Sequence, residues 1–206
     1  MLRPLTSSTI IQDINSTRPG HFGFFFFDFM NAGKSNERSL LSSLIVQLSG
    51  QSNDLFDVPL RLYSSHRNDS QPPSVRELTQ CLEEMLRAAS EVPIYIIIDA
   101  LDECPFTNGQ SSPRQQVLDL VKKFVELNLP NLRVCVTSRP EADIQATLRP
   151  LTSTSNTIFL HDESGQKNDI FDFVSSKISS YANLRRWREK DKEFAIETLS
   201  GNADGT

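Results

Sequence analysis

Cysteine is scarce in this chain of 206 residues, and the three cysteines, Cys81, Cys104 and Cys135, are far apart. Their odd number and wide spacing exclude a disulfide framework and the paired CxxC spacing of structural zinc sites. Histidine is equally scarce, and the three histidines have no metal-ligand spacing. These absences favour a reducing compartment and give a metallohydrolase no obvious set of ligands.

Long hydrophobic runs and clusters of basic residues are also missing. The longest apolar run, residues 22–29, is too short to cross a bilayer and contains Asp28. The N-terminal residues do not resemble a signal peptide. Acidic residues outnumber basic ones, with a net charge of -5, and the short arginine run at residues 185–188 is followed by acidic residues, which is typical of a solvated helix face. We therefore expect a cytoplasmic protein that binds neither nucleic acid nor membranes.

Strand-like and helix-like segments alternate along the chain. Continuous apolar runs predict strands at residues 22–29, 94–99, 132–137 and 157–160. Apolar residues at helical spacing predict helices within residues 8–14, 40–48, 78–89, 117–127, 141–148 and 170–181. Polar residues dominate positions 50–73 and predict a surface excursion with one short helix around Leu60. Because parallel strands need crossover helices, the alternation predicts a doubly wound α/β sheet.

Two helix starts carry the spacing of a capping box, in which a Ser hydroxyl and a Glu or Gln side chain satisfy free backbone N–H groups. Ser74 and Glu77 form the first pair, and Ser112 and Gln115 form the second, with Pro113 at the first helical position. The helix within residues 40–48 has Ser35 or Asn36 available as its N-cap. These signals place helix starts directly after loops.

Acidic side chains follow the predicted strand at residues 94–99. Asp99 ends that strand, and Asp102 and Glu103 come one turn later. In open α/β sheets, ligands bind beyond the carboxyl ends of the strands. A carboxylate at such a strand end can hold Mg²⁺ beside a nucleotide phosphate, and a second can orient an attacking water. The alternative without function is that these acids only cap the following turn.

The segment IIIDALDECP at residues 96–105, followed by VCVTSRPE at residues 134–141, resembles the NACHT-type P-loop NTPases of the STAND class. The most similar subgroup comprises fungal proteins with a nephrocystin-3-like N-terminal domain, and the resemblance covers residues 8–206. It implies a three-layer P-loop NTPase-like fold, with a parallel sheet and helices on both faces. Mg²⁺ and ATP or GTP are the cofactors that it implies.

The resemblance also assigns roles to four residues. It places a magnesium ligand at Asp99, catalytic acids that polarise water at Asp102 and Glu103, and a sensor of the terminal phosphate at Arg139. An Arg at the end of a strand suits such a role because its planar fork bridges phosphate oxygens. The alternative for Arg139 is a surface residue paired with Glu141.

The family's phosphate-binding pattern, GxxxxGK[ST], does not occur in this sequence. The triplet Gly33-Lys34-Ser35 lacks the first glycine of the pattern, and we interpret Lys34 as part of a turn. The resemblance therefore implies that the first strand, which carries the Walker A loop, is missing, so that two inner strand edges are unpaired. Residues 1–182 would be a partial NTPase core, and residues 183–206 the start of an incomplete helical region.

Two functions from different classes stay open. One is a fragment of a regulatory, signal-transducing and innate-immunity-like NTPase module, which would bind nucleotide only with the phosphate loop supplied. In full-length relatives such modules adjoin ankyrin or WD40 repeats and can form homo-oligomers. The other is a non-catalytic interaction scaffold that has lost nucleotide binding. A haloacid-dehalogenase-type phosphatase is disfavoured, because it needs two acids two residues apart, whereas Asp99 and Asp102 are three apart.

Overall fold

The computed structural model describes residues 20–31, 35–66, 71–89, 92–107, 112–158, 164–181 and 183–201. The chain divides into two compact units, Met1–Leu151 and Thr152–Thr206, and each is described here by itself. The helix predicted at residues 8–14 and the side chain of Lys34 lie outside the described residues. The domain boundary expected after residue 182 stays a prediction.

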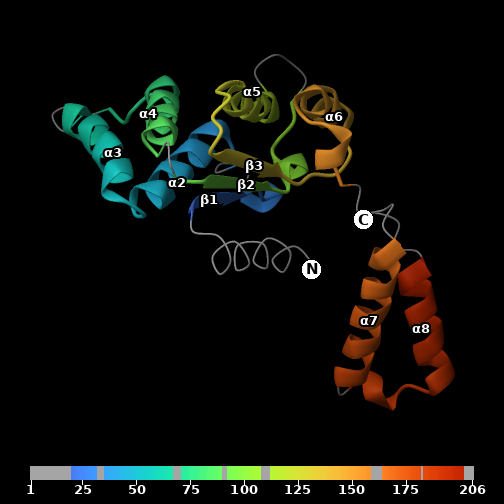
Figure 1. Ribbon diagram of the computed structural model, residues 1–206. Helices are drawn as coiled ribbons and strands as arrows, with labels where there is room; N and C mark the ends of the chain where they lie inside the picture. Colours follow the sequence, from blue (N-terminus) through green and yellow to red (C-terminus); the bar gives the residue numbers. More distant parts are fainter. Residues whose placement is uncertain are drawn as a thin grey trace. The chain divides into compact units, whose positions relative to one another are not determined.

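Three parallel strands form the sheet of the first unit, in the order β1-β2-β3 (Figure 1). These strands are β1 (His21–Phe26), β2 (Ile94–Asp99) and β3 (Leu132–Val136). Residue Ile94 pairs with His21 on one side and with Leu132 on the other, so the carboxyl ends of all three strands meet at one edge. The unalternating apolar sequence of β2 thus reflects a central strand, as predicted, and the fold is α/β with a parallel sheet.

Strand β1 is shorter than the predicted run at residues 22–29. It ends at Phe26, the Phe27 N–H still donates to the Asp99 carbonyl at 3.0 Å, and the chain then enters the 3-10 turn η1 (Phe29–Asn31). The sequence stays apolar past the end of the strand, but only part of this extension belongs to the core. Phe27 is buried, whereas Phe29 is 65% exposed. Continuous hydrophobicity therefore marked the strand but overestimated its length.

The fourth strand, expected at residues 157–160, is not found in the described part of that segment. Thr157 and Ile158 lie outside any strand, and the two following residues are not among those described. The Thr157 N–H donates to the Thr154 carbonyl at 3.3 Å, which closes the short 3-10 turn η4 (Thr154–Asn156). Because Ile158 is 74% exposed, its apolar side chain here marks no buried strand.

The helices of the first unit bury their apolar sides in one core with the sheet. They are α2 (Glu37–Ser49), α3 (Asn53–His66), α4 (Val75–Ala88), α5 (Pro113–Glu126) and α6 (Ala142–Leu148), which continues into the 3-10 turn η3 (Arg149–Leu151). Helices α4 and α5 lie on one side of the sheet (Figure 1). Their buried residues join Ile94, Ile96 and Ile98 of β2. The predicted second layer of helices, on the other face, stays a prediction.

Helix starts follow the sequence signals with one exception. Asn36 caps α2, and Ser74 and Glu77 form the predicted capping box, with the Ser74 N–H donating to the Glu77 carboxylate at 2.7 Å. The second capping box is wrong, because the Ser112 hydroxyl forms no cap and instead accepts a hydrogen bond from the Thr107 N–H at 3.2 Å. Ser112 therefore closes the preceding loop rather than the first turn of α5.

Helix α3 is longer than the one short helix expected around Leu60, since it runs over 14 residues. Leu55 and Val58 are buried at helical spacing, while the Ser and Asp side chains that suggested a loop lie on the exposed side. The polar composition thus described one face of a helix and not a surface loop.

The second unit consists of α7 (Ser164–Ser180) and α8 (Glu189–Gly201), joined through the 3-10 turn η6 (Leu184–Arg186). The two helices pack against each other, and Ile178 is buried, as expected for the apolar periodicity of residues 170–181. Arg188 pairs with Asp191 at 2.9 Å, which agrees with a solvated helix face. Within the described residues, no helix combines the length and apolarity that a membrane span requires.

Candidate functional site

The loops that leave the three strands meet at the carboxyl edge of the sheet, where ligands bind in open α/β folds. Backbone hydrogen bonds join the loops after β2 and β3: the Thr137 N–H donates to the Ile98 carbonyl at 2.9 Å, and the Leu101 N–H donates to the Thr137 carbonyl at 3.0 Å. The acids after β2 therefore lie beside the end of β3.

Asp99 is the last residue of β2 and is 9% exposed. Its Oδ1 accepts a short hydrogen bond from the Thr137 hydroxyl, whose oxygen in turn accepts from the Ala100 N–H at 3.1 Å. No hydrogen bond to Oδ2 is found within the described part of the chain, so this second oxygen can accept a cation or a donor. Thr137, the residue directly after β3, fixes the carboxylate, a role that the sequence did not suggest.

The backbone turns sharply directly after Asp99. Ala100 has φ 54 and ψ 47, in the left-handed region that L residues with a Cβ adopt at a cost of about 1 kcal/mol. The fully buried Leu101 side chain and the Thr137 contact hold this turn in place, and the 3-10 turn η2 (Leu101–Glu103) follows. The turn aims the two later acids, Asp102 and Glu103, in different directions.

Asp102 faces the end of β3. Its Oδ1 accepts the Arg139 backbone N–H at 3.1 Å, and its Oδ2 lies 3.5 Å from the Arg139 guanidinium Nε. The Asp102 side chain is 9% exposed, whereas that of Arg139 is 53% exposed. The structure thus brings these two predicted site residues together. In the described chain Arg139 forms its ion pair with Asp102, and none is found between Arg139 and Glu141.

Glu103 faces the loop after β1 instead. Its Oε2 accepts the Phe29 N–H at 3.4 Å, which connects η2 with η1. Both acids that were expected to polarise water therefore hold backbone N–H groups. Among the described residues, no cluster of three or more His, Cys, Asp or Glu could hold a metal ion. A cation at Asp99 would consequently need most of its ligands from water or from a bound molecule.

Sequence analysis missed Arg114, whose side chain is only 11% exposed. Its Nη2 donates to the Asp102 carbonyl at 2.6 Å, its Nε donates to the Cys104 carbonyl at 3.0 Å, and its Nη1 lies 3.5 Å from the Asp143 carboxylate. The guanidinium also stacks on Phe106, at 5.3 Å from the ring centre. Arg114 thus fixes the loop that carries both acids.

A signal for Arg114 was present in the sequence. A cation in the first turn of a helix is unfavourable beside the positive end of the helix dipole, so Arg114 at the start of α5 needed partners elsewhere. Arg114 lies between Ser112 and Gln115, which have the spacing of a capping box. That interpretation left the unfavourable position of the Arg114 charge unexplained.

An open hollow of about 560 Å³ lies at the end of β1. Its lining residues come from β1, the following loop and the start of α2: Phe25, Phe26, Asp28, Asn31, Ser35 and Ser39. The buried Ser35 hydroxyl donates to the Asp28 carbonyl at 2.9 Å, and the Cys104 thiol contacts the Ser35 carbonyl at 3.5 Å. Burial raises the pKa of Cys104 to about 12, which makes this thiol a hydrogen-bond donor and not a nucleophile.

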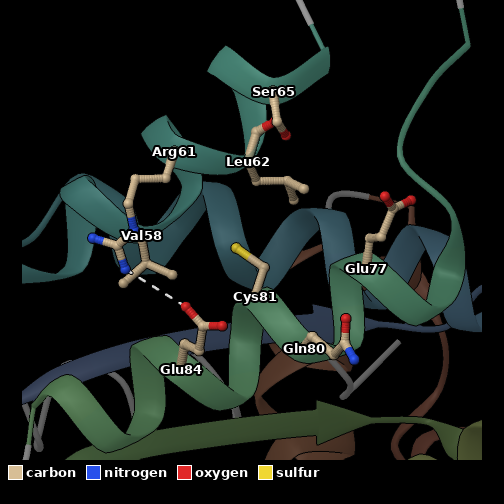
Figure 2. Close-up of a pocket in the computed structure, with 8 residues that line it drawn as sticks. All are labelled: Val58, Arg61, Leu62, Ser65, Glu77, Gln80, Cys81 and Glu84. Atoms are coloured by element: carbon tan, nitrogen blue, oxygen red, sulfur yellow. Dashed lines mark hydrogen bonds and ion pairs between the residues drawn. The ribbon is translucent and has the colours of Figure 1, made fainter.

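A second hollow, of about 280 Å³, lies between α3 and α4, away from the predicted residues. Figure 2 shows the Cys81 side chain directed from α4 towards Leu62 of α3, with the Arg61–Glu84 ion pair, at 3.5 Å, joining the two helices. Burial raises the pKa of Cys81 to about 11. Neither Asp99 nor Arg139 lines this hollow, so it is separate from the strand-end site.

Comparison with known proteins gives one family. A family model described as "Nephrocystin 3, N-terminal" matches residues 5–139. The matched region includes Asp99, Asp102 and Glu103 and ends at Arg139. No curated protein and no solved structure is significantly similar to the chain.

Proposed function

Because this chain belongs to the nephrocystin-3 N-terminal family, we propose that it carries the strand-end half of a nucleotide-binding regulatory NTPase module, of the NACHT type within the STAND class. The observation that supports the proposal best is the approach of an acid and a cation at one sheet edge. The Thr137 hydroxyl holds the carboxylate of Asp99, and Asp102 holds Arg139, which lies two residues after Thr137. A magnesium nucleotide presents the complementary charges, a cation and a terminal phosphate.

Asp99 is the residue that suits Mg²⁺ in this proposal. One of its oxygens is fixed by the Thr137 hydroxyl, so the carboxylate is oriented before a ligand arrives. Mg²⁺ commonly takes only one or two carboxylates and completes its coordination with water and phosphate oxygens, so a single acid at this edge fits it. When bound, the ion would neutralise phosphate charge, while Thr137 and the Ala100 turn keep the carboxylate in place.

Arg139 is the residue that suits the terminal phosphate. Its guanidinium is half exposed and is paired at 3.5 Å with Asp102 through one nitrogen, which leaves other donors for phosphate oxygens. Asp102 in this proposal positions Arg139 through the backbone N–H as well as through the ion pair. The water-polarising roles of Asp102 and Glu103 stay predictions, since either carboxylate would first have to release a backbone donor.

Binding of ATP or GTP further requires N–H groups and a Lys that cradle the phosphates, and the sequence contains no GxxxxGK[ST] loop to supply them. We infer that these groups come from outside this sequence. The module would then act as a signal-transducing switch in a larger cytoplasmic receptor, next to ankyrin, WD40 or similar repeats and with a homo-oligomeric active state.

A second function is favoured by a different observation. The sequence lacks the phosphate-binding loop, and Arg139 is already paired with the Asp102 carboxylate. Both features suit a non-catalytic scaffold that keeps the fold without binding nucleotide. In that case the strand-end contacts would serve only to connect the three loops.

Titration calorimetry with Mg·ATP and Mg·GTP distinguishes the two functions. It is performed on this chain and on a chain extended upstream, with Asp99→Asn as the variant and Asp57→Asn, on the exposed side of α3, as the control. The NTPase proposal expects binding in the extended chain that falls at least about tenfold in Asp99→Asn, equivalent to about 1.4 kcal/mol. Absence of binding in both chains would support the scaffold.

A further inference from the structure

The outer edge of β1 presents backbone groups at every second residue. The Phe27 N–H donates to the Asp99 carbonyl of β2 at 3.0 Å, so the odd-numbered residues of this segment face β2. Alternation turns the N–H and C=O groups of the even-numbered residues away from the sheet. These outward residues of the strand are Phe22, Phe24 and Phe26.

Helix α2 bonds the first two outward residues through glutamine side chains. The Gln51 amide accepts from the Phe22 N–H at 2.8 Å and donates to the Phe22 carbonyl at 2.5 Å. The Gln47 amide repeats this pattern at Phe24, at 3.0 Å and 2.8 Å. A carboxamide fits this edge because its oxygen accepts and its nitrogen donates, so that one group serves both the N–H and the C=O of one residue.

The third outward residue, Phe26, lies between two positions that are already bonded. Directly after the strand, the Ser35 hydroxyl accepts from the Asp28 N–H at 3.3 Å and donates to the Asp28 carbonyl at 2.9 Å. Four residues before Gln47, α2 carries Ser43, whose short side chain accepts from Gln47 Nε2 at 2.9 Å. Among the described residues, no hydrogen bond reaches the outward N–H or C=O of Phe26.

The hollow of about 560 Å³ at the end of β1 lies at this unbonded position. Two aromatic residues, Phe25 and Phe26, line it. Its polar lining residues are Asp28, Asn31, Ser35 and Ser39. A volume of this size, with aromatic surface and a few polar groups, is typical of a site for a small molecule.

We propose that this hollow binds a small planar ligand with a primary carboxamide or lactam group, through the Phe26 backbone. The carbonyl oxygen of the ligand accepts from the Phe26 N–H, and its adjacent N–H donates to the Phe26 carbonyl, as the glutamine amides do at Phe22 and Phe24. A carboxylate has no proton to donate, and an ammonium group accepts none. Neither Asp99 nor Arg139 lines the hollow, so the site is independent of the proposed nucleotide site.

An extended peptide is not the expected occupant. A strand would bond successive outward residues, but the Gln47 amide and the Ser35 hydroxyl occupy the positions on either side of Phe26. A trans peptide bond also directs its C=O and N–H to opposite sides, whereas Phe26 requires both from one side. A terminal or cyclic amide meets this requirement.

Two-dimensional proton–nitrogen NMR on the full chain tests the ligand chemistry, with benzamide as the probe. We expect saturable binding that shifts the Phe26 amide signal. N,N-dimethylbenzamide and benzoate cannot donate, and benzyl alcohol has one oxygen for both roles, so each should bind at least about tenfold more weakly. Equal affinity for any of these three analogues, or a benzamide titration that leaves the Phe26 signal unmoved, would overturn the proposal.

A variant that fills the position from within the chain tests the site itself. Ser43→Gln extends the row of glutamines by four residues, so its amide should bond the Phe26 backbone and weaken benzamide binding at least about tenfold. Val46→Gln adds the same side chain at a 71% exposed position on α2 and should leave binding unchanged. Equal benzamide affinity in the two variants would contradict the site. The analogue series uses the parent chain, so it decides the proposal even if Ser43→Gln does not fold.

Discussion

The two outer strands of the sheet have opposite solutions for their free backbone groups. On β1, the amides of Gln47 and Gln51 bond the outward backbone of Phe22 and Phe24. On β3, no described side chain does the same for Val134. Strand sequence does not explain this difference, since both strands are short and apolar. The difference comes from α2, which carries its glutamines along β1. The neighbouring helix, and not the strand itself, thus decides whether the outer edge of a strand is open or closed.

Forcing α2 away from β1 should have the largest effect on this comparison. A Cβ on Gly23 would lie 2.7 Å from Leu44 Cδ2, so in Gly23→Ala either the fully buried Leu44 side chain or the helix that holds both glutamines must shift. We expect a loss of about 2–3 kcal/mol in the free energy of unfolding, measured by urea denaturation. At Gly50 a Cβ would meet no atom closer than 3.8 Å, and Gly50→Ala is the control. Equal losses in the two variants would contradict the explanation.

Removing the glutamines themselves should have the next largest effect. The double variant Gln47→Ala and Gln51→Ala loses the four bonds to β1 and converts a closed edge into an open one. We expect about 1–3 kcal/mol lower stability and, in sedimentation, species larger than those of the parent chain. Ser49→Ala, on the same helix, should change neither. Unchanged sedimentation of the double variant would show that the amides do not protect this edge.

Thiol labelling offers a finer probe of the open edge. Cys135 on β3 is exposed, whereas Cys81 and Cys104 are buried with pKa values raised to about 11 and about 12. In the folded chain we expect one reactive thiol, which Cys135→Ser removes, and three after denaturation. Although Cys135 is accessible to solvent, partial desolvation of its thiol and the neighbouring Asp99 raise its pKa, so its labelling should accelerate as the pH rises. Comparable labelling of Cys104 in the folded chain would argue against the described packing.

The smallest effect concerns a charge on α2 that touches neither edge. Burial, helped by Asp119, raises the pKa of Glu37 above its usual value. The stabilisation linked to protonated Glu37 is therefore present at low pH and lost as the pH rises through its folded-state pKa. Relative to the parent, the free energy of unfolding of Glu37→Gln should rise between pH ~3 and pH ~7. The rise should be about 0.5 kcal/mol or less, because the carboxyl group is partly exposed. Paired urea titrations check this, and a difference that changes in the opposite direction would refute it.

Local patterns predicted the elements and the position of the strand-end site. The unalternating run at β2 indicated a central strand, and its terminal Asp99 lies at the carboxyl edge as expected. Asp102 and Arg139 were selected separately, and their contact depends on how the ends of β2 and β3 are placed side by side. The sequence pattern indicates which strand ends carry polar residues but not which side chains meet.

The misses have physical causes of the same kind. Arg114 acts through carbonyl groups of a loop that precedes its helix, and carbonyl groups have no signature in a sequence. Ser112 had the right spacing for a cap, but the loop at Thr107 competes for its hydroxyl. Residues 157–160 satisfied the strand pattern, but the described part, Thr157 and Ile158, lies outside any strand, and a run this short carries little information without a neighbouring strand.

The spacing of Gln47 and Gln51 has a consequence for evolution. Four residues of a helix advance about 6 Å, and two residues of a strand advance about 6.6 Å. The spacing of the two amides along α2 therefore matches the spacing of alternate residues along β1. Because the amides bond β1 only through its backbone atoms, the side chains of Phe22 and Phe24 are free to change. Inserting or deleting one residue in either segment, however, would move the amides away from the backbone groups that they bond. Selection should therefore preserve the lengths of β1 and α2 more strictly than the side chains of β1.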